Sequence, residues 1–158
     1  MHNDRTLQAG KGRSLFRWIY LPPLFILALS GFAQMPIFKR YYIADIPGLG
    51  WLAQFYVTHY LHYLAAILFI ALFTYIFVDY VSMGRKEIKL TISGYFRGTV
   101  LTGIIVSGLF LVIRNLSGTY MRPDLIVLLD LIHLGLVILF LFSSLYCLIL
   151  KKKWTTVR

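Results

Sequence analysis

Long apolar runs alternate with short polar segments along the whole chain. Four of these runs are long enough to cross the roughly 30 Å hydrocarbon layer of a membrane as helices: Phe16–Met35, Trp51–Val78, Gly94–Ile113 and Leu125–Leu150. The first run belongs to this series and is not followed by the small residues of a cleavage site, so we do not expect a signal peptide. The pattern predicts an all-α fold, a four-helix transmembrane bundle that forms one integral-membrane domain over residues 1–158.

The composition leaves no room for a separate soluble domain. Hydrophobic residues make up 59% of the chain and charged residues 14%, and the mean hydropathy is +0.74. No phosphate-binding loop, nucleophilic triad, iron-sulfur cysteine set or internal repeat is visible. A large catalytic module would therefore have to belong to another polypeptide.

The positive charge follows the pattern of a membrane topology. The net charge is +10, and twelve of the sixteen basic residues lie before or at the start of the first run, between the second and third runs or at the start of the third, or after the fourth. The other two connections carry only four: Lys39, Arg40, Arg114 and Arg122. Basic residues gather on the cytoplasmic side of membrane proteins, so both termini are predicted to be cytoplasmic. The charge thus indicates topology and contact with anionic lipid, and it does not indicate nucleic-acid binding.

Two histidines stand inside different apolar runs. His62 lies about 16 Å along a helix from Trp51, and His133 about 14 Å from Asp124. An ionisable residue inside a membrane span is costly and by default indicates a functional site. Two imidazoles at similar depth predict the axial ligands of a haem iron, although hydrogen bonds to one another or to the backbone would also satisfy them. Cys147 is the only cysteine and no Cys-x-x-Cys-His motif occurs, so b-type haem is expected.

Three further residues have open roles. His59 stands one turn before His62 and is an alternate ligand, or a contact for a propionate, a quinone head group or a proton. Asp130 stands one turn before His133. It is a candidate proton carrier or a hydrogen-bond partner of a ligand histidine. An equal alternative is that it bonds nearby hydroxyl groups. Arg114 is a possible propionate contact, and solvated loop charge is the simpler interpretation.

These motifs resemble one known family, the four-helix membrane cytochrome b subunits of respiratory formate dehydrogenases and membrane-bound nickel-iron hydrogenases. The resemblance rests on Ala28-Leu-Ser-Gly31-Phe in the first run, His62-Tyr-Leu-Ala-Ala-Ile-Leu-Phe in the second and His133 in the fourth. It implies that His62 and His133 hold an outer haem b. The family's inner haem takes a histidine near the start of the first helix and another fourteen positions along the fourth. Here Arg17 and Cys147 occupy those positions, so we expect one haem.

The resemblance also implies the function. We expect a b-type haem subunit of a respiratory complex in the bacterial or archaeal cytoplasmic membrane, which passes electrons between an outer iron-sulfur or multihaem c-type cytochrome partner and menaquinone or ubiquinone. Such a subunit would not act on the terminal substrate alone. A haem-free membrane anchor or assembly subunit is the main alternative. A small transporter or channel is a third possibility, but the sequence lacks the repeated halves that transporters tend to show.

Overall fold

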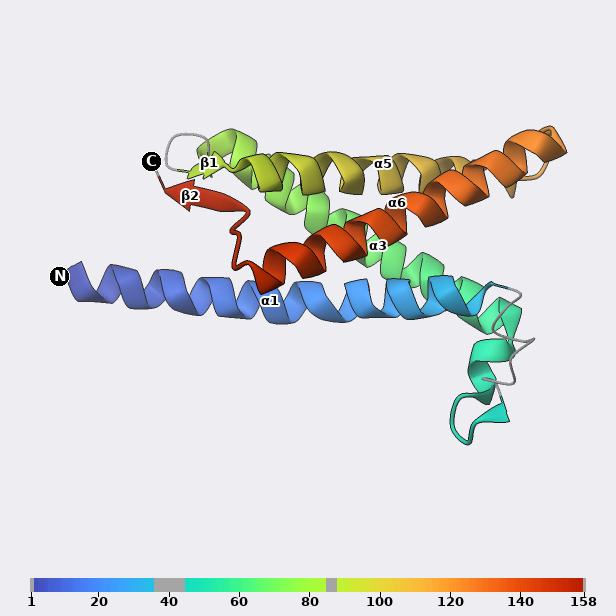
Figure 1. Cartoon of the computed structure of the whole chain (residues 1–158), viewed down its shortest axis with the longest axis horizontal. Coiled ribbons are helices and arrows are strands. Elements are labelled where there is room, and N and C mark those ends of the chain that lie inside the picture. Colours follow the sequence, from blue (N-terminus) through green and yellow to red (C-terminus); the bar gives the residue numbers. More distant parts are fainter. Residues whose placement is uncertain (1, 36–44, 85–87, 158) are drawn as a thin grey trace. The chain divides into compact units, whose positions relative to one another are not determined.

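The computed structural model describes residues 2–35, 45–84 and 88–157. The chain divides into two compact units, Met1–Val78 and Asp79–Arg158. Each unit contains two long helices, and each is described here by itself (Figure 1).

Unit 1 contains the first two long helices. Helix α1 spans His2–Ala33, and after the short 3-10 turn η2, Gly50–Ala53, helix α3 spans Phe55–Asp79. Gln54 adopts an extended conformation between η2 and α3, so the membrane helix begins four residues later than the apolar run from Trp51 predicts. Tyr20 of α1 packs against Phe69 of α3, with ring centroids 5.4 Å apart.

Unit 2 is a helical hairpin with a small sheet at its open end. After the π turn η3, Tyr80–Gly84, strand β1 (Ile88–Leu90) leads into α5, Ile92–Arg114, and α6 follows over Pro123–Ile149. Helices α5 and α6 lie side by side (Figure 1). Pro123 suits the first position of α6, because proline has no backbone N–H to leave unsatisfied there. Gly118, with φ of +85°, takes the left-handed conformation that the connecting turn requires.

The small sheet departs from the all-α expectation. Strand β2, Thr155–Val157, pairs antiparallel with β1, so that Leu90 lies opposite Thr155. The Thr91 hydroxyl caps α5 by accepting from the Gly94 N–H, and it also contacts the carbonyl oxygens of Lys153 and Trp154 at 2.8 and 3.1 Å. Strands of three residues give no period in the sequence, so the apolar pattern could not reveal them.

Within the part of the chain that the structure describes, three helical segments are long and apolar enough to cross a membrane: Phe55–Ser82, Ile92–Arg114 and Pro123–Ile149. In the most apolar part of Pro123–Ile149, only 6% of the residues are buried inside the protein. Water would not tolerate so much exposed apolar surface, so these helices have the character of a multi-pass membrane protein. The apolar part of α1, Trp18–Ala33, is shorter, so the predicted fourth span stays a prediction.

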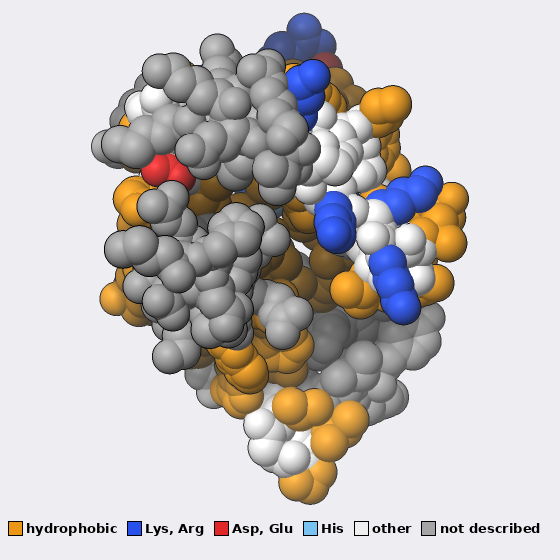
Figure 2. All heavy atoms as spheres, turned by 90° about the vertical axis from the view of Figure 1, so that its left-hand side faces the viewer, with side chains coloured by type: hydrophobic (Ala, Val, Ile, Leu, Met, Phe, Trp, Pro, Cys, Tyr) orange, Lys and Arg blue, Asp and Glu red, His pale blue; other side chains and the backbone are white. Residues whose placement is uncertain are grey.

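The predicted charge pattern lies only partly within the described residues. Arg85, Lys86, Lys39, Arg40 and Arg158 fall outside them. Within unit 2, Lys89 of β1 and Lys151–Lys153 before β2 are exposed at the end that carries the sheet. Figure 2, which looks at this end of the molecule, shows Lys and Arg side chains beside hydrophobic ones. This arrangement is typical of a membrane interface.

Candidate functional site

His62 is held by a serine and a glycine of the neighbouring helix. Its Nδ1 lies 3.0 Å from the Ser30 hydroxyl oxygen, and Ser30 is 1% exposed. The same hydroxyl donates its only proton to the Ile26 carbonyl oxygen one turn earlier, at 2.6 Å. The hydroxyl must therefore accept from His62, because a carbonyl oxygen cannot donate. Nδ1 of His62 therefore carries a proton in this contact.

Gly31 permits this close approach of α1 to the His62 ring. A Cβ atom built at Gly31 would lie 3.2 Å from Cε1 of His62, which is tighter than ordinary van der Waals contact. Any larger residue at this position would push the imidazole away from Ser30. The pair Ser30-Gly31 thus supplies both the acceptor and the space that the ring needs.

His133 has the same environment in unit 2. Its Nδ1 lies 2.9 Å from the Ser107 hydroxyl oxygen, and Ser107 donates to the Ile104 carbonyl oxygen at 3.0 Å. A Cβ atom built at Gly108 would lie 3.3 Å from Cε1 of His133. Nδ1 of His133 therefore also carries the proton of this contact.

The two units thus contain one repeated constellation, which we call the serine–histidine pairs: Ser30 with His62, and Ser107 with His133. In each, the first helix carries an apolar-Ser-Gly-apolar segment and the second helix carries the histidine. The sequence analysis found no internal repeat, because only two of the four positions are identical and the separations to the histidine differ, 32 and 26 residues. The recurring Ser-Gly dipeptide was the signal that could have revealed it.

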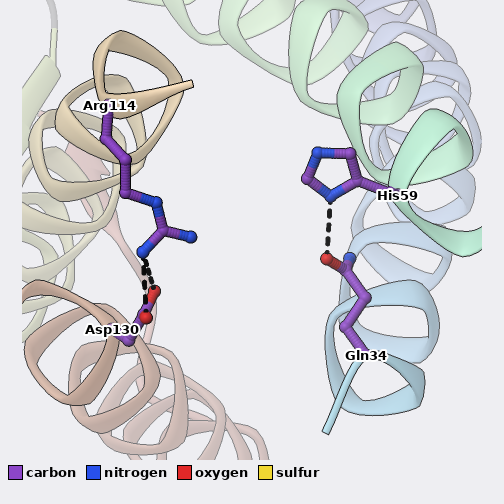
Figure 3. A network of polar contacts seen from close by, with 4 residues as sticks. All are labelled: Gln34, His59, Arg114 and Asp130. Carbon is purple, nitrogen blue, oxygen red and sulfur yellow. Dashed lines mark hydrogen bonds and ion pairs between the residues drawn. The ribbon is translucent and has the colours of Figure 1, made fainter. Parts of the chain in front are cut away.

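A second polar contact lies between each serine–histidine pair and the loop that joins its two helices. We call these contacts the loop-side pairs, Gln34 with His59 and Arg114 with Asp130 (Figure 3). In unit 1, Nδ1 of His59 lies 3.0 Å from Oε1 of Gln34. In unit 2, the Arg114 guanidinium donates to both carboxylate oxygens of Asp130, at 3.1 and 3.0 Å.

The structure brings together some of the predicted site residues. Arg114 and Asp130, which the sequence analysis treated separately, form one ion pair whose side chains are 25% and 51% exposed. His59 contacts Gln34, a residue that the sequence analysis did not single out. His62 and His133 lie in different units. His62 stands seven residues after the start of α3 and His133 ten residues after the start of α6, a difference of about 5 Å along a helix.

The donor set suits a haem better than a bare metal ion. Among residues 2–35, 45–84 and 88–157, no cluster of three or more His, Cys, Asp or Glu side chains is placed to hold a metal. A b-type haem needs only two axial ligands from the protein, and imidazole nitrogens with a hydrogen-bonded Nδ1 suit that role. Cys147, at the position where the family has an inner ligand, is a buried free thiol. The side chain of Arg17 lies outside the described residues.

No family model, curated protein or solved structure matches the chain.

Proposed function

We propose that this chain is a b-type haem subunit of a membrane redox complex. One observation supports the proposal: the two histidines expected to ligate iron sit in equivalent serine–histidine pairs, in which a serine hydroxyl bonds Nδ1 and orients the ring, as is usual for histidines that ligate metals. Haem b supplies reversible one-electron chemistry when it is bound through two such imidazoles.

The residues of the chain have definite tasks in this proposal. Ser30 and Ser107 keep the Nδ1 proton in place and orient the rings, while Gly31 and Gly108 make room for them. Hydrogen bonds of this kind raise the basicity of the ligand nitrogen and thereby favour the oxidised metal. The apolar side chains of the helices exclude water. Arg114, already paired with Asp130, is the candidate contact for a propionate.

The proposed partners follow from the family resemblance. Electrons pass between an iron-sulfur or c-type cytochrome subunit and membrane quinone, in the cytoplasmic membrane of a bacterium or archaeon. The basic residues favour an orientation with both termini in the cytoplasm. Catalysis on the terminal substrate belongs to another subunit.

A haem-free membrane anchor is the second candidate, and the same contacts favour it in part. Each histidine is already bonded within its own hairpin, so the serine–histidine pairs would also stabilise a bundle without any cofactor.

A visible spectrum of the purified protein separates the two candidates. We expect reduced b-type absorbance and a pyridine haemochrome ratio near one haem per chain, in keeping with the absence of both inner ligands from the sequence. His62→Ala and His133→Ala should each abolish the absorbance, whereas His59→Ala should retain it. A ratio near zero in the wild-type chain would favour the anchor, and a ratio near two would require a second haem site. Loss of haem in His59→Ala but not in His62→Ala would mean that the ligand on α3 is His59 and not His62.

A further inference from the structure

The turn that ends α6 has a lysine where glycine is usual. The Lys151 N–H bonds the Leu148 carbonyl oxygen at 3.1 Å. The Lys152 N–H bonds the Cys147 carbonyl oxygen at 2.8 Å. These two contacts form a Schellman motif, which needs one residue in the left-handed conformation and most often uses glycine there. Here that residue is Lys151, with φ of +53°. A side chain kept at a position that disfavours it indicates a task for that side chain.

The start of α5 fastens the residues that follow this turn. The Lys153 carbonyl oxygen lies 2.8 Å from the Thr91 hydroxyl and 3.1 Å from the Ser93 hydroxyl. The Thr91 N–H donates to the Trp154 carbonyl oxygen at 3.0 Å. A Cβ atom at Gly94 would collide with the same oxygen, so the absence of a side chain there lets the segment lie against α5. A charge that only sets topology needs no fixed backbone, so these contacts indicate a built surface.

The pairing of β1 with β2 adds a further lysine to this surface. Lys89 lies opposite Thr156, so their side chains share one face of the small sheet. Leu90 occupies the other face, where its side chain lies beside Gly94 of α5. Lys89 and Thr156 therefore face away from α5, and both are exposed.

Four exposed lysines thus share the end of unit 2 that carries the sheet (Figure 1). We call this surface the lysine end; it consists of Lys89, Lys151, Lys152 and Lys153. Within residues 88–157 the two carboxylates, Asp124 and Asp130, lie in the first third of α6, at the opposite end of that helix. The positive charge of the lysine end is therefore not neutralised by an acidic side chain of this range.

Aromatic and apolar side chains adjoin the lysine end where α6 leaves the membrane. Nζ of Lys152 lies 5.2 Å from the ring centroid of Tyr146, in the last turn of α6. The Trp154 ring lies 4.2 Å from the guanidinium carbon of Arg97 and is still exposed. Ile149, the last residue of α6, is exposed as well. Tyrosine and tryptophan are typical of the level of the lipid headgroups.

We propose that the lysine end binds the headgroup of an anionic phospholipid. The lysine ammonium groups donate to the phosphate oxygens, and the acyl chains lie along the exposed apolar surface of α6. A soluble phosphate compound would leave that apolar surface uncovered, so the phosphate belongs to a lipid. A zwitterionic headgroup brings its own positive charge, which the lysines repel, so an acidic lipid such as phosphatidylglycerol is favoured. The site uses none of the residues of the proposed haem site and does not depend on it.

Quenching of Trp154 fluorescence by brominated lipid, measured on the full chain in uncharged micelles, tests the site. Trp18→Phe combined with Trp51→Phe leaves Trp154 as the single tryptophan. Brominated phosphatidylglycerol should reach half-maximal quenching at a mole fraction at least about fivefold lower than brominated phosphatidylcholine, since one lysine near a membrane surface accounts for about that factor. Inorganic phosphate, compared with sodium chloride at equal ionic strength, should not relieve the quenching.

Two further changes in this background separate a built site from a simple excess of charge. Lys151→Asn removes one charge but suits the left-handed position, so the turn should remain while the preference falls about fivefold. Thr91→Val keeps every lysine but loosens the C-terminal segment, so the preference should fall toward parity. The matched controls are Arg122→Asn, at the other end of α6, and Thr102→Val, whose hydroxyl bonds the Gly98 carbonyl oxygen of its own helix. Both should behave as the background.

Equal quenching by the two lipids in the single-tryptophan background overturns the inference. An undiminished preference in Lys151→Asn also overturns it. The same result in Thr91→Val would mean that loose charge is sufficient and that no built site exists. Relief of quenching by inorganic phosphate would make the ligand a soluble phosphate and refute the lipid. If Thr91→Val does not fold, Lys151→Asn decides, because its turn tolerates asparagine.

Discussion

At the scale of single residues, Ser30 and Ser107 determine what the two histidines can do. Each serine hydroxyl accepts from the Nδ1–H of its histidine, and the loss of a hydrogen bond in an apolar surrounding costs about 1–3 kcal/mol. The sequence alone placed His62 and His133 in the proposed site but not the serines. A sequence does not distinguish a serine hydroxyl that bonds only its own helix from one that also accepts a hydrogen bond from a neighbouring helix.

Ser30→Ala and Ser107→Ala should each raise the midpoint potential of the haem. Loss of the acceptor makes the imidazole a weaker donor, which destabilises the oxidised iron. The shift should be on the order of tens of millivolts, as one hydrogen bond implies. Ser143→Ala is the matched control, since Ser143 bonds only the Phe140 carbonyl oxygen of its own helix. Spectroelectrochemical titration measures the effect, and potentials equal to wild type in both serine variants would refute the positioning role.

At the scale of helices and strands, the sequence predicted most of the fold. Helices α5 and α6 begin and end within two residues of the predicted runs, because their residues are predominantly apolar and Thr91 and Pro123 mark their starts. The prediction failed where contacts distant in sequence decide the structure. The pairing of Leu90 with Thr155 joins segments that have no pattern of their own. Helix α3 starts at Phe55 because Gln54 is extended. The apolar run from Trp51 continues through this position, so it does not reveal where the helix begins.

Thr91 joins the start of α5 to the C-terminal strand, so its hydroxyl should matter to both elements. Thr91→Val keeps the shape but removes the cap on Gly94 and the contacts to residues 153 and 154. Loss of a helix cap costs about 0.5–2 kcal/mol, and release of β2 should expose the C-terminal residues to protease. Thr102→Val is the control, because Thr102 bonds only the Gly98 carbonyl oxygen. Limited proteolysis and thermal melting measure the change; an equally resistant C-terminal segment in both variants would contradict the role of the cap.

At the scale of the whole molecule, the charge asymmetry predicts the orientation in the membrane. In a Cys147→Ser background, Thr119→Cys marks the loop between α5 and α6, and Arg158→Cys marks the C-terminus. An impermeant maleimide added to intact cells should label the loop variant, while the C-terminal variant should react only after the membrane is opened. The reverse pattern would invert the predicted topology.

The two serine–histidine pairs also predict how the chain holds its cofactor. The proposed haem takes one imidazole from each serine–histidine pair, His62 and His133. If both ligands come from one chain, co-expression of His62→Ala and His133→Ala chains should give no haem, because neither chain has a complete ligand pair. If two copies exchange units, mixed assemblies contain one intact pair and part of the haem returns. Co-expression of wild type with His62→Ala calibrates the assay. If both ligands come from one chain, the haem content of that sample should equal the amount of wild-type chain. Haem recovered from the two mutant chains together would therefore show that ligands from two chains can hold one haem, as in a dimer of exchanged units.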